Sequence, residues 1–355
     1  MMNINQIIHE ELQDITGIMS NIPDGYEHGI LDETYESIKS IKKLGNDILT
    51  LVAEYNYDNF IENEAFSMIY GIELNTVTGD YGDLNQFIHK SNLSISFEET
   101  DSPNSKGEYT SYKTKNKTNF DPSERRNITV YFNKIVRDKI DEEIKTNSLT
   151  AMSVYFILVK YTFSTLIHEL QHFHDDFRSR NSYSKNKANY DYEKKQIFTK
   201  NEVKDMYQHV LSYNYDPKEY NVIADLVNGD LDLLKNGEEI PNKKKVVGNL
   251  YSLYYYTGVI LDPITAITYL RLQHEVNARF TQAIDKTTYY TADFINGKVT
   301  FIMKPMHDVI KEFTGNFYMY KALLEDQRKS LIRKVAQFWY FEEEKVNKLN
   351  ARQIR

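Results

Sequence analysis

The segment from Thr150 to Phe177 contains neither proline nor glycine, and its apolar residues recur at steps of three and four. This spacing predicts one long helix whose apolar side lies in the protein core. His168 and His172 stand four residues apart on a different side of that helix, so their side chains project one above the other. The residues expected on the core side are Met152, Tyr155, Phe156, Val159, Phe163, Leu166, Ile167, Leu170 and Phe173.

The two histidines belong to an HExxH pattern, His168-Glu169-Leu170-Gln171-His172. Two imidazoles one helical turn apart can bind the same ion, and zinc is the ion that this pattern typically holds. Zinc lowers the pKa of a bound water toward neutrality, and Glu169 is placed to take the proton of that water as a general base. The sequence therefore predicts a Zn2+ site with His168 and His172 as metal ligands and Glu169 as the catalytic residue.

The motif and its surroundings resemble a known group of enzymes. The stretch from Thr165 to His172, together with Glu275 to Arg279, resembles the zincin metallopeptidases, and among them the gluzincin-like type. The chain further resembles HExxH proteins of tailed bacteriophages. The resemblance lies in the sequence Leu-Ile-His-Glu-Leu-Gln-His, followed by Asp-Asp-Phe-Arg-Ser and later by Glu-x-Asn-Ala-Arg. The resemblance covers two helices and an edge strand. It implies a zincin-like core but no particular substrate.

The resemblance also implies the third metal ligand. In gluzincins a glutamate on a later helix completes the site, and here that residue is Glu275, on a helix expected from Pro263 to Lys286. The metzincin type is excluded, because Asp175 and Arg178 stand where its pattern has glycine and histidine. Arg279, one turn after Glu275, is expected to pair with its carboxylate. Other candidates for the third ligand are His274, Asp262, His209, Asp175 and Asp176.

Further residues are expected to support the site without binding the metal. Asp175 or Asp176 is expected to orient the ring of His172, whereas His174 points to another face of the helix. The reaction also needs a side chain that stabilises an oxyanion. Sequence alone does not select it among the many tyrosines. The candidates are Tyr289, Tyr290 and His307.

Composition narrows the classes of protein and partner. The chain has 355 residues, of which 41% are hydrophobic, so it can bury a substantial core. Its formal net charge of −8 argues against the broad basic surface that nucleic-acid binding needs, although a local patch such as Lys243 to Lys245 is left open. No nucleic-acid partner is expected. Because there is no cysteine, a zinc site must use histidine and carboxylate ligands.

The expected fold class is α+β and predominantly helical. It comprises a zincin-like core with the active-site helix, a small antiparallel or mixed sheet, and a helical C-terminal part. Four parts are expected in chain order. They are an N-terminal helical segment (1–65), a zincin-like subdomain with the sheet and the HExxH helix (66–180), a helical subdomain that supplies the third ligand (181–296) and a C-terminal helical segment (297–355).

Strand and loop patterns flank the motif helix. Leu93–Phe97 and Asn127–Phe132 alternate as strands do, and a long polar insertion from Glu98 to Arg126 separates them. By analogy with zincins, which hold peptides along an edge strand beside the active-site helix, Ile128–Phe132 is the candidate edge strand. The polar stretch from Arg178 to Lys200 is expected to be an exposed loop that acts as a flap.

The remaining chain is expected to be mostly helical. The N-terminus carries Ile4, Ile7 and Ile8 at helical spacing and lacks the apolar run of a signal peptide. Lys160 interrupts the apolar stretch from Leu149 to Ile167, so no membrane span is expected. The aromatic cluster from Phe338 to Phe341 is expected to be core. Further helices are expected at 201–211, 219–235, 244–259, 306–313 and 318–348, and a strand at 298–303.

Two functions from different classes follow. The first is a phage-encoded zinc metallopeptidase, expected to be an endopeptidase, that hydrolyses a peptide or protein substrate. The alternative is a bacteriophage virion structural or packaged (ejected) protein, in which a zincin-like fold serves assembly with other virion proteins and protease activity is absent or incidental. A phage-encoded protein of either kind is expected in the virion or the host cytoplasm. A closed cleft or a missing metal would favour the alternative.

Overall fold

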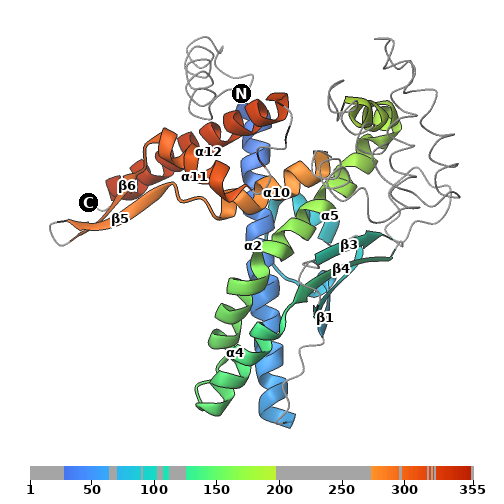
Figure 1. The fold of residues 1–355 in the computed structure, drawn as a ribbon, viewed down its shortest axis with the longest axis vertical. Coiled ribbons are helices and arrows are strands. Elements are labelled where there is room, and N and C mark those ends of the chain that lie inside the picture. The colour runs from blue at the N-terminus through green and yellow to red at the C-terminus, as the bar shows by residue number, and fades with distance from the viewer. Residues whose placement is uncertain are drawn as a thin grey trace, which may run out of the picture. The chain divides into compact units, whose positions relative to one another are not determined.

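The structure of the protein is a computed structural model, and it describes residues 28–63, 70–88, 91–101, 107–111, 125–196, 273–295, 298–317, 320, 323 and 325–352. Helices dominate, and two small sheets accompany them (Figure 1), which confirms an α+β class. The elements are α2 (His28–Asn63), β1 (Tyr70–Glu73), η1 (Leu74–Thr76), η2 (Gly82–Leu84), α3 (Asn85–Ile88), β2 (Asn92–Glu99), β3 (Gly107–Ser111), β4 (Arg125–Phe132), α4 (Lys134–Lys145), α5 (Ala151–Gln196), α10 (Gln273–Asp285), β5 (Tyr290–Ile295), β6 (Lys298–Met303), α11 (Met306–Asn316) and α12 (Glu325–Arg352).

The chain divides into two compact units. The first consists of residues 1–181, 277–318 and 326–355, and the second of residues 182–276 and 319–325. The boundary at residue 277 falls inside α10, which is one continuous helix. The four-part division expected from the sequence stays a prediction.

The larger sheet has four strands in the order β1-β2-β4-β3. β2 pairs with β4 in parallel, and the two outer strands pair antiparallel to their neighbours, so the sheet is mixed. β4, which contains the predicted edge strand Ile128–Phe132, lies inside the sheet, because it pairs with both β2 and β3. The prediction of the edge strand was therefore wrong. Among the described strands the edge on that side is β3, which lies inside the predicted polar insertion from Glu98 to Arg126.

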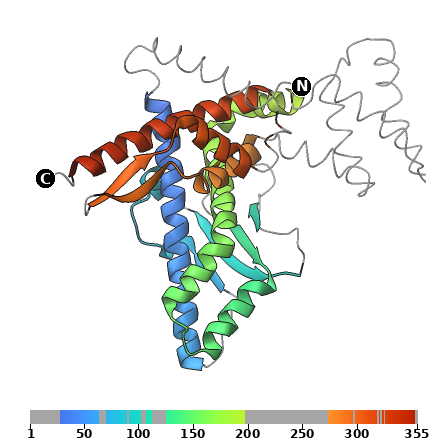
Figure 2. The same ribbon diagram turned by 60° about the vertical axis from the view of Figure 1, so that its left-hand side comes forward.

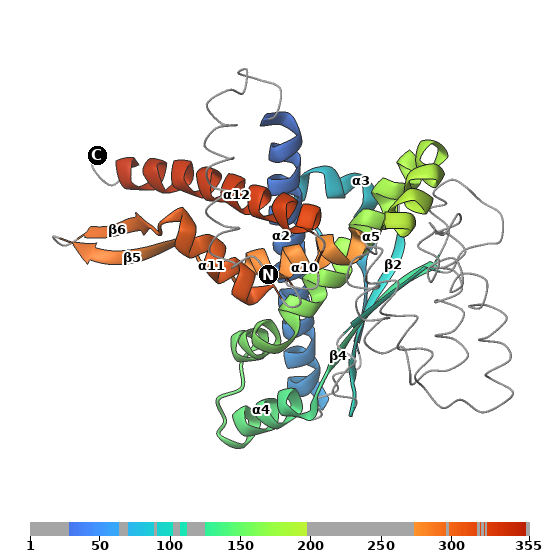
Figure 3. The same cartoon turned by 45° about the horizontal axis from the view of Figure 1, so that its top comes forward.

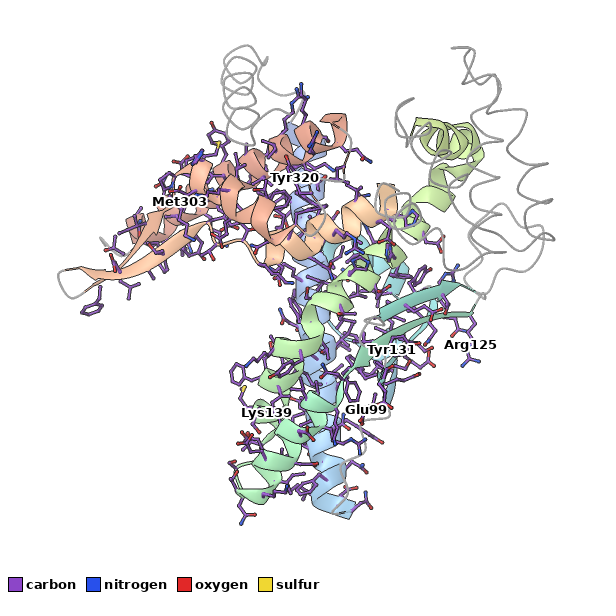
Figure 4. The ribbon with its side chains drawn as sticks, viewed as in Figure 1. Glu99, Arg125, Tyr131, Lys139, Met303 and Tyr320 are labelled. Carbon is purple, nitrogen blue, oxygen red and sulfur yellow. The ribbon has the colours of Figure 1, made fainter. Side chains whose placement is uncertain are left out.

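Alternation along the strands separates a core face from a polar face. The core face carries Leu93, Ile95 and Phe97 on β2, opposite Ile128 and Val130 on β4. The other face is polar, and Figure 4 shows Tyr131 projecting from β4. Burial and the negative charges of Glu108 and Glu98 raise the pKa of the Tyr131 hydroxyl. This division follows the two-residue period of a strand with one buried face.

Helix α5 packs against α2 through a glycine. A Cβ atom on Gly45 of α2 would lie 3.1 Å from Cε2 of Phe163 and 3.2 Å from Cγ2 of Ile167 on α5. The two helices therefore approach closely at this point, and Figure 1 shows them side by side. Most of the predicted core stripe is buried, but Met152 and Phe156 are 60% and 61% exposed. The first turns of α5 bury Val154 and Leu158 instead, residues that continue the stripe of the later turns at four-residue steps.

Helix α5 is longer than the sequence pattern predicted. It runs to Gln196, so the expected exposed loop from Arg178 to Lys200 is wrong over most of its length. The segment has no proline or glycine, and polarity alone does not end a helix.

Aromatic packing joins α12 to α2 and α10, and Figure 2 shows the ribbon of α12 passing across that of α2. Phe338 of α12 packs against Tyr35 of α2 and Phe280 of α10. The Tyr35 hydroxyl donates a 2.7 Å hydrogen bond to Glu342, and the Trp339 indole donates one of 2.7 Å to the carbonyl of Lys304. The predicted core cluster is buried only at Phe338, because Tyr340 is exposed and Trp339 and Phe341 are half-buried. β5 and β6 form an antiparallel hairpin, of which only β6 was predicted.

Some predictions lie outside the described residues. These are the N-terminal helix with Ile4, Ile7 and Ile8, the helices predicted between 201 and 259, the patch Lys243 to Lys245, and the candidates His209 and Asp262. One helix of the described chain, Ala151–Asp176, is long and apolar enough to cross a membrane by length and composition. A core helix passes the same test, and this helix contributes Leu166 and Leu170 to the core. The absence of a span stays a prediction.

Candidate metal centre

Three side chains converge at one point of the structure. His168 and His172 come from α5 and Glu275 from the first turn of α10, and their ligand atoms lie within 4.8 Å of one another. These are the three residues that the sequence predicted as metal ligands. In the described part of the chain no other group of histidine and carboxylate ligands meets the same criterion. The fold therefore brings together three side chains that could hold a metal ion.

The donor atoms of the two histidines have the spacing of ligands that share an ion. Nε2 of His172 lies 3.1 Å from Nε2 of His168, and the two rings stand at 90° to each other. With zinc–nitrogen bonds of about 2.0 to 2.1 Å, two ligands of a tetrahedral site are about 3.3 Å apart. A hydrogen bond between the two rings would also give this distance. A neutral imidazole has only one N–H, so one of the two histidines would then have to carry its proton on Nε2. The donor set of two nitrogens and one carboxylate suits zinc.

Burial differs among the three ligands. Glu275 is 1% exposed and His168 is 8% exposed, whereas His172 is only half-buried. A divalent cation held by the three side chains would offset the desolvation cost of the buried Glu275 carboxylate. The half-buried His172 marks the side on which the group is more accessible.

Glu169 follows His168 on α5 and is itself buried, with 5% exposure. Its carboxylate lies against Gly107 of β3: a Cβ atom on Gly107 would be 2.7 Å from Oε1 of Glu169 and 2.6 Å from Cγ2 of Thr165. Any residue other than glycine at position 107 would therefore collide with the predicted general base or with its neighbour one turn away. The glycine is what allows the edge strand to approach the motif helix this closely.

A second contact fixes β3 along the same helix. The hydroxyl of Tyr109 donates a 2.8 Å hydrogen bond to Oδ2 of Asp176, and its ring packs edge-on against Phe173. Gly107 and Tyr109 both face the core side of the sheet, because they stand opposite Val130 and Ile128 in the register. β3 therefore follows α5 past the metal ligands, with its other edge unpaired among the described strands.

Asp175 and Asp176 each accept hydrogen bonds from residues of the elements around α5. Asp175 accepts hydrogen bonds from Nε2 of Gln171 at 2.8 Å and from Nδ2 of Asn277 at 3.1 Å, and Asp176 accepts the bond from Tyr109. His174 is buried, with its Nδ1 3.4 Å from Nε2 of Gln171. Both aspartates thus hold neighbouring elements to α5. Their predicted action on the ring of His172 stays a prediction.

The other candidates are placed as follows. His274, a rival third ligand, has its Nε2 4.0 Å from Oε1 of Glu275, and more than a third of its side chain is exposed. Tyr289 is buried, and its pKa is raised by burial first and then by the charge of Glu342. Tyr290 packs against Phe301. These neighbours belong to the C-terminal elements and not to α5, so the oxyanion-stabilising group stays unassigned. His307 faces Asp308 on α11.

No family model, no curated protein and no solved structure matches this chain. The functional argument therefore rests on the residues themselves.

Sequence reasoning missed two residues that the structure brings to the site, Gly107 and Tyr109. A signal was present, because Gly107 opens the short run Gly107-Glu108-Tyr109-Thr110-Ser111, which has a tyrosine and a threonine at strand positions. The polar residues on both sides of this run hid it.

Proposed function

We propose that the protein is a zinc-dependent metallopeptidase. The observation that carries the proposal is the convergence of His168, His172 and Glu275 within 4.8 Å, with Glu169 next to the first ligand. The three ligands come from two helices, and Glu275 lies 103 residues after His172. A short motif such as HExxH can arise by chance. It is less easily explained by chance that a carboxylate distant in sequence lies beside the two histidines of that motif. The wording of the motif further supports a phage-encoded protein of the zincin group.

The residues divide the chemistry between them. His168, His172 and Glu275 would hold zinc, which when bound supplies an acidified water and a positive charge beside the substrate carbonyl. Glu169 takes a proton from the attacking water and later delivers it to the nitrogen of the leaving amine. The burial of Glu169 removes competing solvent from its carboxylate, and Thr165 and Gly107 limit where that carboxylate can move.

The edge strand supports a peptide as the substrate. Among the described strands β3 pairs only with β4, so its other edge offers main-chain donors and acceptors. A peptide that adds to this edge as a further strand would run past Glu169, because Gly107 lies against that residue. Main-chain pairing does not depend on the identity of side chains. The arrangement therefore suits extended segments of a peptide or an unfolded protein.

A peptide library tests this function. The zinc-loaded protein is incubated with peptides from a digested proteome, and new termini are identified by mass spectrometry. We expect new termini in the zinc-loaded sample, none after chelation, and recovery when zinc is added back. If a preparation with bound zinc cuts nothing in the library, the peptidase proposal fails and the alternative, a virion protein with a zincin-like fold, gains weight.

Replacement of Gly107 by alanine tests the close approach of β3 to the general base. We expect Gly107→Ala to keep zinc and to lower peptide hydrolysis by roughly 10- to 100-fold, because the new methyl group displaces the Glu169 carboxylate by an amount on the order of 1 Å. The measurements are zinc content and the rate of cleavage of one peptide found in the library.

The matched control is Gly315→Ala. A Cβ atom on Gly315 of α11 meets nothing within 4 Å, so this variant should keep full activity and be slightly more stable. Equal activity in both variants would show that Gly107 does not limit the position of Glu169.

A further inference from the structure

A chain of hydrogen bonds joins α5 to α10 close to the candidate metal ligands, and Figure 3 shows the ribbons of the two helices next to each other. Oε1 of Gln171 lies 2.9 Å from the hydroxyl of Thr281, and Nε2 of Gln171 lies 2.8 Å from Oδ1 of Asp175. Oδ2 of Asp175 lies 3.1 Å from Nδ2 of Asn277. The Thr281 hydroxyl also lies 3.2 Å from the carbonyl oxygen of Asn277, so the four residues close a loop that passes twice between the two helices. We call these four residues the α5–α10 network.

The chemistry of the four groups fixes the direction of every bond. An ionised Asp175 can only accept, so Gln171 and Asn277 must each turn an amide N–H toward it. Gln171 then presents only its carbonyl oxygen to α10, and the hydroxyl of Thr281 must be the donor. The network therefore has one consistent arrangement, and a shift of α10 along α5 would break both of its links between the helices.

Apolar packing alone does not set the register of α10 so narrowly. The buried apolar residues of α10 are Val276, Ala278, Phe280, Ala283 and Ile284. Hydrophobic burial is not directional, whereas a slip of one residue moves a helix by about 1.5 Å and turns it by about 100°. Metal–ligand distances tolerate only about 0.2 Å. Glu275 stands two residues before Asn277 on the same helix, so the register that the network sets also sets the position of the third ligand.

Lys334 is a basic residue whose charge interacts with Asp175 of the network. Lys334 of α12 is largely buried, and its amine lies 5.5 Å from the centre of the Phe280 ring. Burial lowers the pKa of Lys334, and the charge of Asp175 acts in the opposite direction. Lys334 thus lies within electrostatic reach of Asp175, the residue that accepts both amide hydrogen bonds of the network.

We propose that the α5–α10 network positions Glu275 and thereby sets the affinity of the site for its metal ion. The four residues are positioning residues: they touch neither the metal ion nor the substrate. The inference rests on the proposed metal site. It names the residues that hold the third ligand, Glu275, beside the two histidines. Its test needs no substrate, because the metal itself is the probe.

Two threonine-to-valine variants give a matched comparison. Thr281→Val removes the hydroxyl that reaches Gln171 across the helices, whereas Thr162→Val removes an equally buried hydroxyl that bonds only to the carbonyl of Leu158 in its own helix. Zinc affinity is measured in the full chain by competition with a chromophoric chelator, and thermal unfolding is measured without metal. We expect Thr281→Val to weaken zinc binding by roughly 10- to 100-fold. Thr162→Val should lose stability but bind zinc as the wild type does.

A second set of variants, which reverses the hydrogen bond between Asp175 and Asn277, tests the proposal even if Thr281→Val fails to fold. Asp175→Asn places two amides opposite each other, and Asn277→Asp places two carboxylates opposite each other. The double variant exchanges donor and acceptor, keeps the net charge and leaves an oxygen at position 175 for Gln171. We expect each single variant to weaken zinc binding and the double variant to recover most of it. The absorption of bound Co2+ should show the same order, with a weaker tetrahedral spectrum in the single variants.

The outcomes separate this inference from the function on which it rests. Wild-type affinity in Thr281→Val, or a double variant no better than the two single variants, overturns the positioning role and leaves the metal site intact. A wild-type chain that binds no zinc overturns the metal site and the positioning role together. An equal loss of zinc affinity in Thr162→Val and Thr281→Val would also overturn the positioning role, since the loss would then follow from reduced stability alone.

Discussion

Glu169→Gln is expected to bind zinc like the wild type and to lose about 10²- to 10⁴-fold of its rate of peptide hydrolysis. Glutamine has nearly the same shape as glutamate but cannot take a proton from water, so the substitution removes the chemistry and leaves the packing against Gly107. Glu169 is not one of the three converging ligands, and its loss should not release the metal. Zinc content and the rate of cleavage of a library peptide measure the two effects separately.

His168→Ala is the comparison for this prediction. Because His168 is one of the three ligands, this variant should lose zinc and activity together. If Glu169→Gln retained full activity, the general base would have to be another group, and the assignment of Glu169 would be wrong.

Glu275→Ala is expected to weaken zinc binding by at least about 100-fold, more than the change of about 10- to 100-fold that follows loss of a residue that only supports a ligand. The site would keep the two histidines of α5, whose spacing is set within one helix and does not depend on α10. The stabilisation that zinc gives the folded protein should shrink accordingly, because it grows with the logarithm of metal concentration over the dissociation constant. Thermal unfolding with and without zinc measures this loss.

The neighbouring histidine provides the control. His274 is the rival ligand nearest in sequence, and its side chain is more exposed than that of Glu275. His274→Ala should bind zinc as the wild type does. A large loss of zinc affinity in His274→Ala, with little loss in Glu275→Ala, would show that His274 and not Glu275 is the third ligand.

The metal ligands were predictable because most of the site is local in sequence. The spacing of His168 and His172 is a property of one helix, and a proline-free and glycine-free stretch makes that helix nearly certain to form. Glu275 was found by resemblance to gluzincins and not by spacing. The structure brings it to the two histidines within 4.8 Å.

The sheet was harder to predict because strand order is not local. Ile128–Phe132 has the alternation of a strand, but nothing in that alternation tells whether the strand has one neighbour or two. Its second neighbour, β3, is short and surrounded by polar residues. The stretch after Arg178 shows the opposite error, because polar composition was taken as a loop where the chain continues as helix.

The α5–α10 network could not be found from sequence. Gln171 lies between the two motif histidines, and its partner Thr281 is 110 residues away. Each of its residues is common on helix surfaces, and only the packing of α10 on α5 brings them together. Residues that position a ligand carry no motif of their own, whereas the ligands do.

The metal content of the purified wild-type protein tests the central claim most directly. The protein is loaded with zinc, separated from free metal by gel filtration and analysed for bound elements. A site of three ligands on a folded chain predicts about one zinc per chain. A well-folded preparation that retains no zinc after this treatment would contradict the metal centre and, with it, the proposed peptidase.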